Sequence, residues 1–157
     1  MKKISTAICI VCLLAAAVFY PPFVTVHADE IPQAVDTSSL PVVGTEWRGE
    51  NPYRGLEAAV KVGESAFAQN CARCHGIQAK SGGIAPDLRF LDRDCDDLKN
   101  IEKKKACFKE TDKYFLLSIR GGKVRNGAVY MPPFDGFFTQ EAMWAIKTYL
   151  EAMKGTD

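Results

Sequence analysis

The sequence predicts a small all-α domain of about four or five short helices joined by long loops. Two segments, residues 56–70 and 140–153, carry apolar side chains at helical spacing. We find no alternation of apolar and polar residues typical of a half-buried strand, and no internal repeat. Proline and glycine are frequent between the periodic segments and indicate turns and loops.

The first 28 residues have the layout of a secretory signal peptide. Two lysines come first, an apolar stretch follows at residues 8–19, and a small-residue cleavage pattern ends at Ala28. An uncleaved membrane anchor is the alternative, but the stretch is short for a span of roughly 20 residues and a proline pair closes it. We therefore expect cleavage after Ala28, a periplasmic location and no membrane-spanning segment in the mature chain.

Removing 28 of the 157 residues leaves 129, which is enough for one domain. The mature chain keeps 18 lysines and arginines against 19 acidic residues, a net charge of −1, because the two lysines near the start are lost. This balance excludes the strongly basic class of nucleic-acid-binding proteins. Its only histidine is His75, and its four cysteines belong to an exported protein in which disulfides are permitted.

The first elements are an arm, a helix and a loop. Residues 29–55 are rich in proline and glycine, and we expect an extended arm, ordered where Trp47 and Tyr53 pack on a surface. The first helix covers residues 56–70, with its apolar face continued by a cysteine. Residues 76–88 are predicted to form a loop.

The second half begins with a charged insert at residues 92–109, in which acidic residues come first and lysines after. Thr111 looks like the N-cap of a helix that a glycine pair at 121–122 ends. Residues 123–138 are predicted to be a loop, and the last helix covers residues 140–153.

The motif Cys-Ala-Arg-Cys-His offers three interpretations. A thioredoxin-like dithiol expects a βαβ setting, which the sequence lacks. A zinc site needs a fourth ligand, and Cys95 or Cys107 would have to supply it at irregular spacing. Haem attachment explains Cys71, Cys74 and His75 together, because these positions share one helical turn. Two thiols can then bond to the vinyl groups of one porphyrin while the imidazole binds its iron.

A second axial ligand must come from distant sequence, and methionine is the candidate. Met143 and Met153 lie within an apolar helix pattern, where core packing is the simpler explanation. Met131 precedes two prolines that stiffen the backbone, so we favour it over a vacant or water-bound position. A His/Met-ligated iron has no open position, which predicts one-electron transfer and not an enzyme.

A buried macrocycle would add apolar volume to a small helical chain. Each candidate neighbour taken alone is better explained as ordinary core packing, and the haem interpretation applies to the set. The candidates are Phe67, Leu88, Phe90, Tyr114, Leu117, Phe134, Ile146 and Tyr149.

The string VGESAFAQNCARCHG, the GGIAPDL loop, MPPF and the closing helix resemble a class I monohaem cytochrome c, over about residues 56–153. The resemblance implies the small cytochrome c fold, with short helices wrapped around one covalently bound haem c within residues 56–157. It also implies thioether bonds at Cys71 and Cys74 and iron ligation by His75 and Met131. In this family a proline carbonyl accepts the imidazole N–H, and Pro86 matches that position.

NPYRG, RNGAVYMPPF and EAMWAIKTYLE are similar to segments of the soluble periplasmic cytochromes that accept electrons from PQQ-dependent alcohol dehydrogenases. This likeness implies a quinoprotein donor and, downstream in the respiratory chain, a terminal oxidase or another cytochrome as acceptor. It implies a monomer. The alternatives are a cytochrome subunit of another periplasmic oxidoreductase, for example in sulfur oxidation, and a haem protein with an open sixth site. The charged insert departs from the pattern.

Cys95 and Cys107 predict a disulfide, because they remain as thiols in an oxidising compartment; two independent buried thiols are the alternative. Bridged Cα atoms lie about 4.4–6.8 Å apart. One continuous helix between them would separate the pair by roughly 18 Å. We therefore expect a short helix at residues 98–104, then a turn that returns Cys107 to Cys95 and holds the insert rigid near the haem.

Residues 99–125 contain nine lysines and arginines against three acidic residues. This predicts a positive patch that attracts an acidic partner, with a solvated helix face as the alternative.

Overall fold

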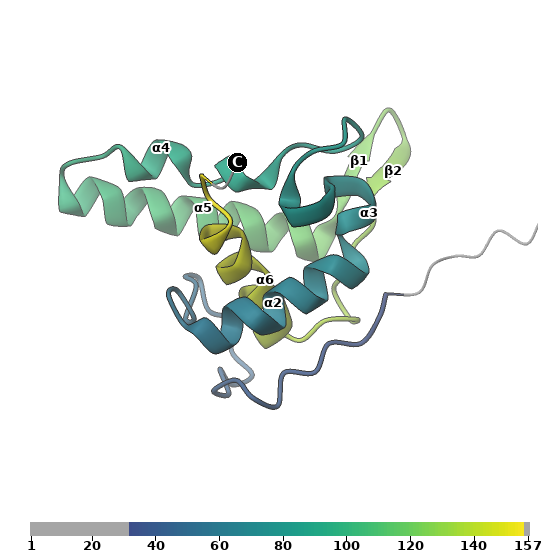
Figure 1. The fold of residues 1–157 in the computed structure, drawn as a ribbon, viewed down its shortest axis with the longest axis horizontal. Helices are drawn as coiled ribbons and strands as arrows, with labels where there is room; N and C mark the ends of the chain where they lie inside the picture. Colours follow the sequence, from purple (N-terminus) through teal and green to yellow (C-terminus); the bar gives the residue numbers. More distant parts are fainter. Residues whose placement is uncertain (1–31, 156–157) are drawn as a thin grey trace, which may run out of the picture. The chain divides into compact units, whose positions relative to one another are not determined.

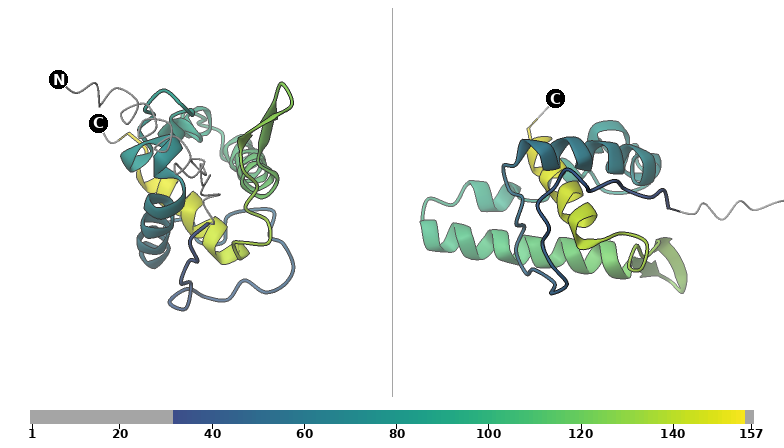
Figure 2. Two further views of the ribbon diagram at one scale, coloured as in Figure 1. Left: turned by 90° about the vertical axis from the view of Figure 1, so that its right-hand side faces the viewer. Right: turned by 90° about the horizontal axis from the view of Figure 1, so that it is seen from below.

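The computed structural model describes residues 32–155, so the predicted signal peptide and the first residues of the arm lie outside the described part. Three helices dominate the described chain: α2 (Glu57–Asn70), α5 (Ile101–Gly121) and α6 (Gln140–Ala152) (Figure 1). Seen from the side, α6 lies between α2 and α5 (Figure 2). The prediction of a small, mostly helical domain is confirmed. Among the described residues, no helix has the length and apolar character needed to cross a bilayer.

Helices α2 and α6 cross at very close range. Ala59, Gly63, Ala66 and Phe67 are the buried residues of α2, at the spacing of one helix face. A Cβ atom at Gly63 would lie 2.0 Å from the backbone oxygen of Ala145 on α6. The first helix was thus predicted to within one residue, and a glycine sets how closely it packs.

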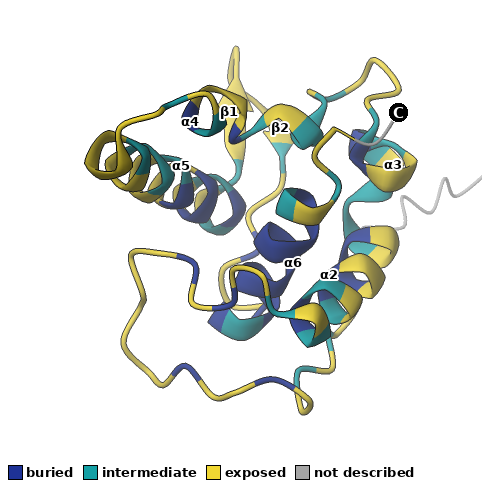
Figure 3. Cartoon of the chain, turned by 60° about the vertical axis from the view of Figure 1, so that its left-hand side comes forward, coloured by how far each residue is buried: buried dark blue, intermediate teal, exposed yellow. Residues whose placement is uncertain are grey.

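Helix α6 is buried on every face. Thr139 caps its N-terminus by accepting a hydrogen bond from the backbone N–H of Ala142, at 3.3 Å. Every residue from Ala142 to Leu150 is buried, including Lys147 (Figure 3). The prediction of this helix is confirmed, and it ends one residue earlier than expected, with Met153 as its C-cap.

The arm runs from residue 32 to α2 without a helix or strand. The side chain of Gln140 donates to the carbonyls of Gly44 and Glu46, and its amide oxygen accepts from the N–H of Arg48, at 3.2 Å. Glu141 accepts from the N–H of Val43 at 3.0 Å. Two polar side chains of α6 therefore hold the arm, a tie that the sequence did not predict.

The two aromatic residues expected to order the arm behave differently. Tyr53 is buried, and its hydroxyl donates to the carbonyl of Pro41. Trp47 keeps 40% of its surface exposed and stacks beneath the guanidinium of Arg120, whose central carbon lies 3.9 Å from the ring centroid.

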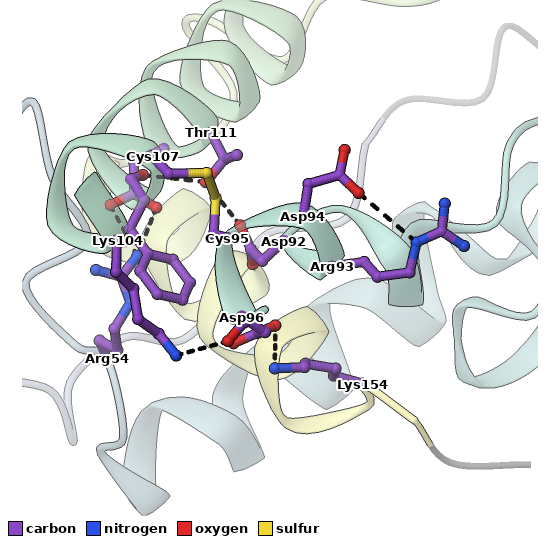
Figure 4. Close-up of a disulfide and its surroundings, with 12 residues drawn as sticks. Arg54, Asp92, Arg93, Asp94, Cys95, Asp96, Lys104, Cys107, Thr111 and Lys154 are labelled. Atoms are coloured by element: carbon purple, nitrogen blue, oxygen red, sulfur yellow. Dashed lines mark hydrogen bonds and ion pairs between the residues drawn. A yellow bond between two sulfur atoms is a disulfide. The ribbon is translucent and has the colours of Figure 1, made fainter. Parts of the chain in front are cut away.

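The insert forms a helical hairpin closed by a disulfide (Figure 4). Helix α4 (Arg93–Asp96) lies beside α5, and the Cα atoms of Cys95 and Cys107 are 5.4 Å apart. The predicted disulfide is confirmed. The predicted helix at residues 98–104 followed by a turn is wrong, because the chain turns before Ile101 and α5 then runs without interruption past Cys107.

Thr111 is not an N-cap. Asn100 caps α5 instead, accepting from the N–H of Lys103 at 3.0 Å. Thr111 lies inside the helix, where its hydroxyl is 2.6 Å from a carboxylate oxygen of Asp92. Because no glycine or proline lies between Asn100 and Gly121, nothing interrupts the helix, and the predicted end at the glycine pair is confirmed.

Residues 123–131 are not the predicted loop. They form an antiparallel hairpin of β1 (Lys123–Arg125) and β2 (Ala128–Met131). The two-residue turn is Asn126-Gly127, with φ angles of 52° and 79°, as a type I′ turn requires.

Candidate functional site

Cys71, Cys74 and His75 come together on one helical turn, as the motif predicted. Cys71 ends α2 and begins α3 (Ala72–His75), and its carbonyl accepts from the N–H groups of Cys74 and His75 at 3.1 and 3.0 Å. Both thiols are free of disulfides. The pKa of the Cys71 thiol is raised to about 12, mainly because the thiol is buried and, to a smaller extent, because Cys74 is close to it. This sulfur therefore carries its proton at neutral pH.

His75 is held in one orientation. Its ring is buried, and Nδ1 lies 3.0 Å from the carbonyl oxygen of Pro86. Since that oxygen can only accept, Nδ1 carries the hydrogen, and Nε2 keeps its lone pair for a ligand. Gly76 makes the turn that follows possible, because a Cβ there would lie 1.7 Å from the carbonyl oxygen of Lys80. The contact that the family resemblance implied is present in the structure.

The residue after Pro86 is anchored by an ion pair that the sequence reading missed. Asp87 caps the 3₁₀ turn η3 (Leu88–Phe90), accepting from the N–H of Arg89 at 3.0 Å, and its carboxylate lies 2.7 Å from the Arg89 guanidinium. The hydrogen bond from Arg89 lowers the pKa of Asp87 below its usual range. The sequence signal for this ion pair was Asp87 directly after Pro86, with Arg89 two residues later.

Met131 is the last residue of β2 and not part of a loop. Its carbonyl packs against the end of α5, where a Cβ at Gly122 would lie 2.4 Å from that oxygen. Beyond the two prolines, the N–H of Phe134 donates to the carbonyl of Ile119 on α5 at 2.9 Å. The backbone on both sides of Met131 is thus fixed by α5, while Met143 is fully buried in the core.

The segments that carry His75 and Met131 are joined. The hydroxyl of Tyr130 donates to the carbonyl of Ile84, which lies in the loop between His75 and Pro86. This hydrogen bond ties β2 to the loop that follows α3 and its 3₁₀ turn η2 (Ile77–Ala79). The two candidate iron ligands therefore lie on adjoining parts of the fold.

The donor set and its surroundings fit a haem. Large apolar side chains are exposed on the segments that adjoin His75 and Met131, which suits a flat apolar group. They are Ile77 at 80%, Ile84 at 63%, Val129 at 67% and Tyr130 at 51%.

The eight predicted haem neighbours divide into three groups. Phe67, Phe134, Ile146 and Tyr149 are buried. Leu88 is half-buried, and the exposed ones are Phe90, Tyr114 and Leu117.

The insert was expected to lie near the haem, but the structure places it away from the candidate iron ligands. From Cys107 to Gly121, α5 rises about 21 Å. Gly122, next along the chain, is the residue that contacts Met131. The disulfide therefore lies toward the N-terminal end of α5, away from the candidate iron ligands. Figure 1 shows α4 and the β1–β2 hairpin near opposite ends of α5.

The family model described as "Cytochrome C oxidase, cbb3-type, subunit III" matches residues 58–150. Cytochrome c550 of Pseudomonas aeruginosa is 49% identical over 131 residues, which cover 81% of each chain. The chain belongs to the monohaem c-type cytochromes. The cytochrome is an electron-transfer protein, and its family implies a covalently bound haem c.

A second relative is an alcohol dehydrogenase that matches over part of its length. Residues of the cytochrome are 34% identical to part of the quinohemoprotein alcohol dehydrogenase ADH-IIG of Pseudomonas putida, over 93 residues. The match covers 59% of the cytochrome and 10% of the dehydrogenase. No solved structure matches the chain at a significant level.

Proposed function

We propose that the cytochrome carries one electron at a time in the periplasm, on a haem c bound through Cys71 and Cys74 with His75 and Met131 as iron ligands. The orientation of His75 carries the proposal, since its Nδ1 is engaged by Pro86 and only Nε2 is left to bind iron. A protonated thiol can add across a vinyl group, with sulfur on one carbon and hydrogen on the other, and the Cys71 thiol keeps its proton. When bound, the haem supplies an iron that alternates between two oxidation states.

Met131 would bind the iron on the face opposite His75. Its position at the end of β2 is fixed by the contact with Gly122. A ligand held in place before it binds loses little conformational entropy. Two protein ligands leave the iron no position for oxygen or a substrate, which favours electron transfer over catalysis.

We propose a PQQ-dependent alcohol dehydrogenase as the electron donor and a terminal oxidase or another cytochrome as the acceptor. The likeness to a quinohemoprotein alcohol dehydrogenase supports the donor, since the name of that protein joins a quinone, a haem and an alcohol substrate. Cleavage after Ala28 would release the mature protein into the periplasm as a monomer.

Replacing Met131 tests the ligand set. In Met131→Ala the haem stays attached through its thioethers, the weak far-red absorption band of the iron–sulfur bond disappears, and the reduced protein binds carbon monoxide. Met143→Leu is the matched control, because Met143 is fully buried in α6 and its replacement leaves the band in place. A Met131→Ala protein that keeps the band and excludes carbon monoxide would show that another residue ligates the iron.

The donor is tested by mixing the oxidised cytochrome with a purified quinoprotein alcohol dehydrogenase and ethanol. We expect one electron per haem to arrive, seen as the sharpening of the haem absorption on reduction. If the dehydrogenase reduces a dye acceptor but leaves the haem oxidised, the proposed donor is wrong.

A further inference from the structure

Helix α5 extends beyond the core against which it packs. Phe115 and Ile119 in its C-terminal half are buried, whereas Ile101 at its N-terminal end is 79% exposed (Figure 3). Ile101, Phe108 and Phe115 are seven residues apart and therefore lie on one face of the helix. The apolar stripe that anchors α5 to the core thus continues onto open surface.

This part of the stripe lines a groove of about 310 Å³. The arm forms its opposite wall, with the Arg54 guanidinium carbon 4.7 Å from the centroid of the Phe108 ring. The complete lining is Glu50, Arg54, Ile101, Lys104, Lys105 and Phe108.

The rim of the groove is positively charged. Lys104 and Lys105 lie on either side of the line from Ile101 to Phe108, because neighbouring helical residues differ by about 100° in direction. The ammonium of Lys104 donates to the carbonyl of Asp96 at 3.0 Å, a neutral acceptor that leaves its charge unbalanced. Glu50 is the acidic residue of the lining, and Lys109 lies 3.5 Å from it. The groove therefore combines an apolar floor with a surplus of cations.

The groove is far from the candidate iron ligands. Helix α5 rises about 30 Å from Ile101 to Gly121. Met131 contacts Gly122 at the C-terminal end of that helix. The disulfide holds the N-terminal end rigid, so the distance is fixed. A partner in the groove would be bound well away from the position at which its electron enters.

We propose that this groove anchors the electron-transfer partner through an acidic segment with an apolar side chain at its tip, an inference that rests on the proposed function. Carboxylates of the segment would pair with Lys104 and Lys105, and the apolar tip would contact Ile101 and Phe108. An apolar side chain that projects from the segment can enter this shallow hollow. Anchoring and electron transfer are then separate steps, carried out at opposite ends of α5.

The test uses the holo-cytochrome variants Lys105→Glu and Ile101→Glu, titrated with the quinoprotein alcohol dehydrogenase by calorimetry at low salt. We expect the dissociation constant to rise about tenfold in each. The matched control is Lys103→Glu, which makes the same charge change on the exposed side of α5 away from the groove and should alter the constant less than about twofold. At saturating dehydrogenase, the rate of haem reduction should be unchanged in all three, because the groove does not carry the electron.

Wild-type affinity in both groove variants would overturn the anchor, whatever the rate of haem reduction. The same holds if Lys103→Glu weakens binding equally, because net charge alone would then explain the effect. Groove-dependent binding without haem reduction would support the anchor and reject the proposed donor. Sedimentation with phosphatidylglycerol vesicles that is lost in the groove variants would assign the surface to a membrane and overturn the proposal.

Discussion

At Gly63 the backbones of α2 and α6 are closer than any side chain would allow, since a Cβ atom there would be 2.0 Å from the oxygen of Ala145 and 2.8 Å from the Cβ of Tyr149. The oxygen belongs to a backbone inside a buried helix and cannot move aside cheaply. Because Gly63 has a hydrogen atom where alanine has a methyl group, α2 and α6 can cross at this distance. Helix α2 leads directly into the cysteine motif.

We expect Gly63→Ala to lower the free energy of unfolding by more than about 2 kcal/mol, because the two helices must separate. Denaturant titration of the holo-protein measures this change. Gly121→Ala is the control, since nothing lies within 4 Å of a Cβ at that position of α5 and alanine is the better helix former. Equal stability of Gly63→Ala and the wild type would show that the crossing can relax.

Asp87 makes the stability depend on pH near the bond that orients His75. The hydrogen bond from Arg89 holds the pKa of Asp87 below its ordinary value of 3.8, so the ionised form is favoured in the native state. This contribution is present above that ordinary value and is lost as the pH falls through the lowered native pKa. We expect the wild type to exceed Asp87→Asn in stability at neutral pH by less than about 1 kcal/mol.

The difference should shrink as the pH falls below 3.8 and through the lowered native pKa of Asp87, measured by unfolding at several pH values. A difference that stayed constant with pH would mean that the Asp87 side chain acts through its hydrogen bond to the Arg89 N–H and not through its charge.

At the scale of elements, the disulfide of the insert makes a separable contribution to stability. We expect the double variant Cys95→Ser, Cys107→Ser to unfold with about 3 kcal/mol less free energy, because the unfolded chain regains the freedom of a short loop. The far-red band should be unchanged, because the bridge and Met131 are at opposite ends of α5. An unchanged denaturation midpoint would indicate that α4 is held in place without the bridge.

Elements were predictable where the signal is local. The ends of α2, α6 and the glycine stop of α5 were predicted to within one residue. The hairpin was missed because strands of three and four residues are too short to show alternation, although Asn126-Gly127 was an available turn signal. The start of α5 was misplaced because threonine caps helices but also occurs inside them, where Thr111 bonds to the distant Asp92.

In the candidate site, too, the residues that are close in sequence were predictable and the features that depend on tertiary packing were not. Cys71, Cys74, His75 and Pro86 lie within one short segment, so the motif and its spacing were sufficient to bring them together. The groove at Ile101 could not be predicted, because its exposure depends on where the core ends beneath α5.

At the scale of the molecule, a buried charge cluster joins four separate parts of the chain: the arm, the segment before α4, α5 and α6. Lys147 of α6 is fully buried, and its ammonium lies 2.5 Å from Asp92, 2.9 Å from Glu151 and 3.6 Å from Asp112. Arg54, at the end of the arm, lies 2.7 Å from Asp112 and completes the cluster. Three carboxylates share two cations, so each cation is needed.

We expect Lys147→Met to cost about 3–5 kcal/mol of unfolding free energy, because it leaves buried carboxylates without their central partner. Lys61→Met is the control, since Lys61 forms an exposed pair with Glu57 on α2 and its loss should cost less than about 1 kcal/mol. Chemical denaturation of the holo-protein compares the two. Similar losses in both variants would show that the remaining carboxylates find other partners.

The hydrogen bonds between the arm and α6 determine the order in which the protein can fold. Val43 bonds to Glu141 and Arg48 to Gln140, pairs that are 98 and 92 residues apart in the chain. Joining such distant segments requires a large loss of chain entropy before any contact compensates for it. The arm, near the start of the described chain, can reach its native position only once α6, near the end of the chain, is available to bond with it. The arm therefore stays unattached until α6, the last helix of the chain, is in place.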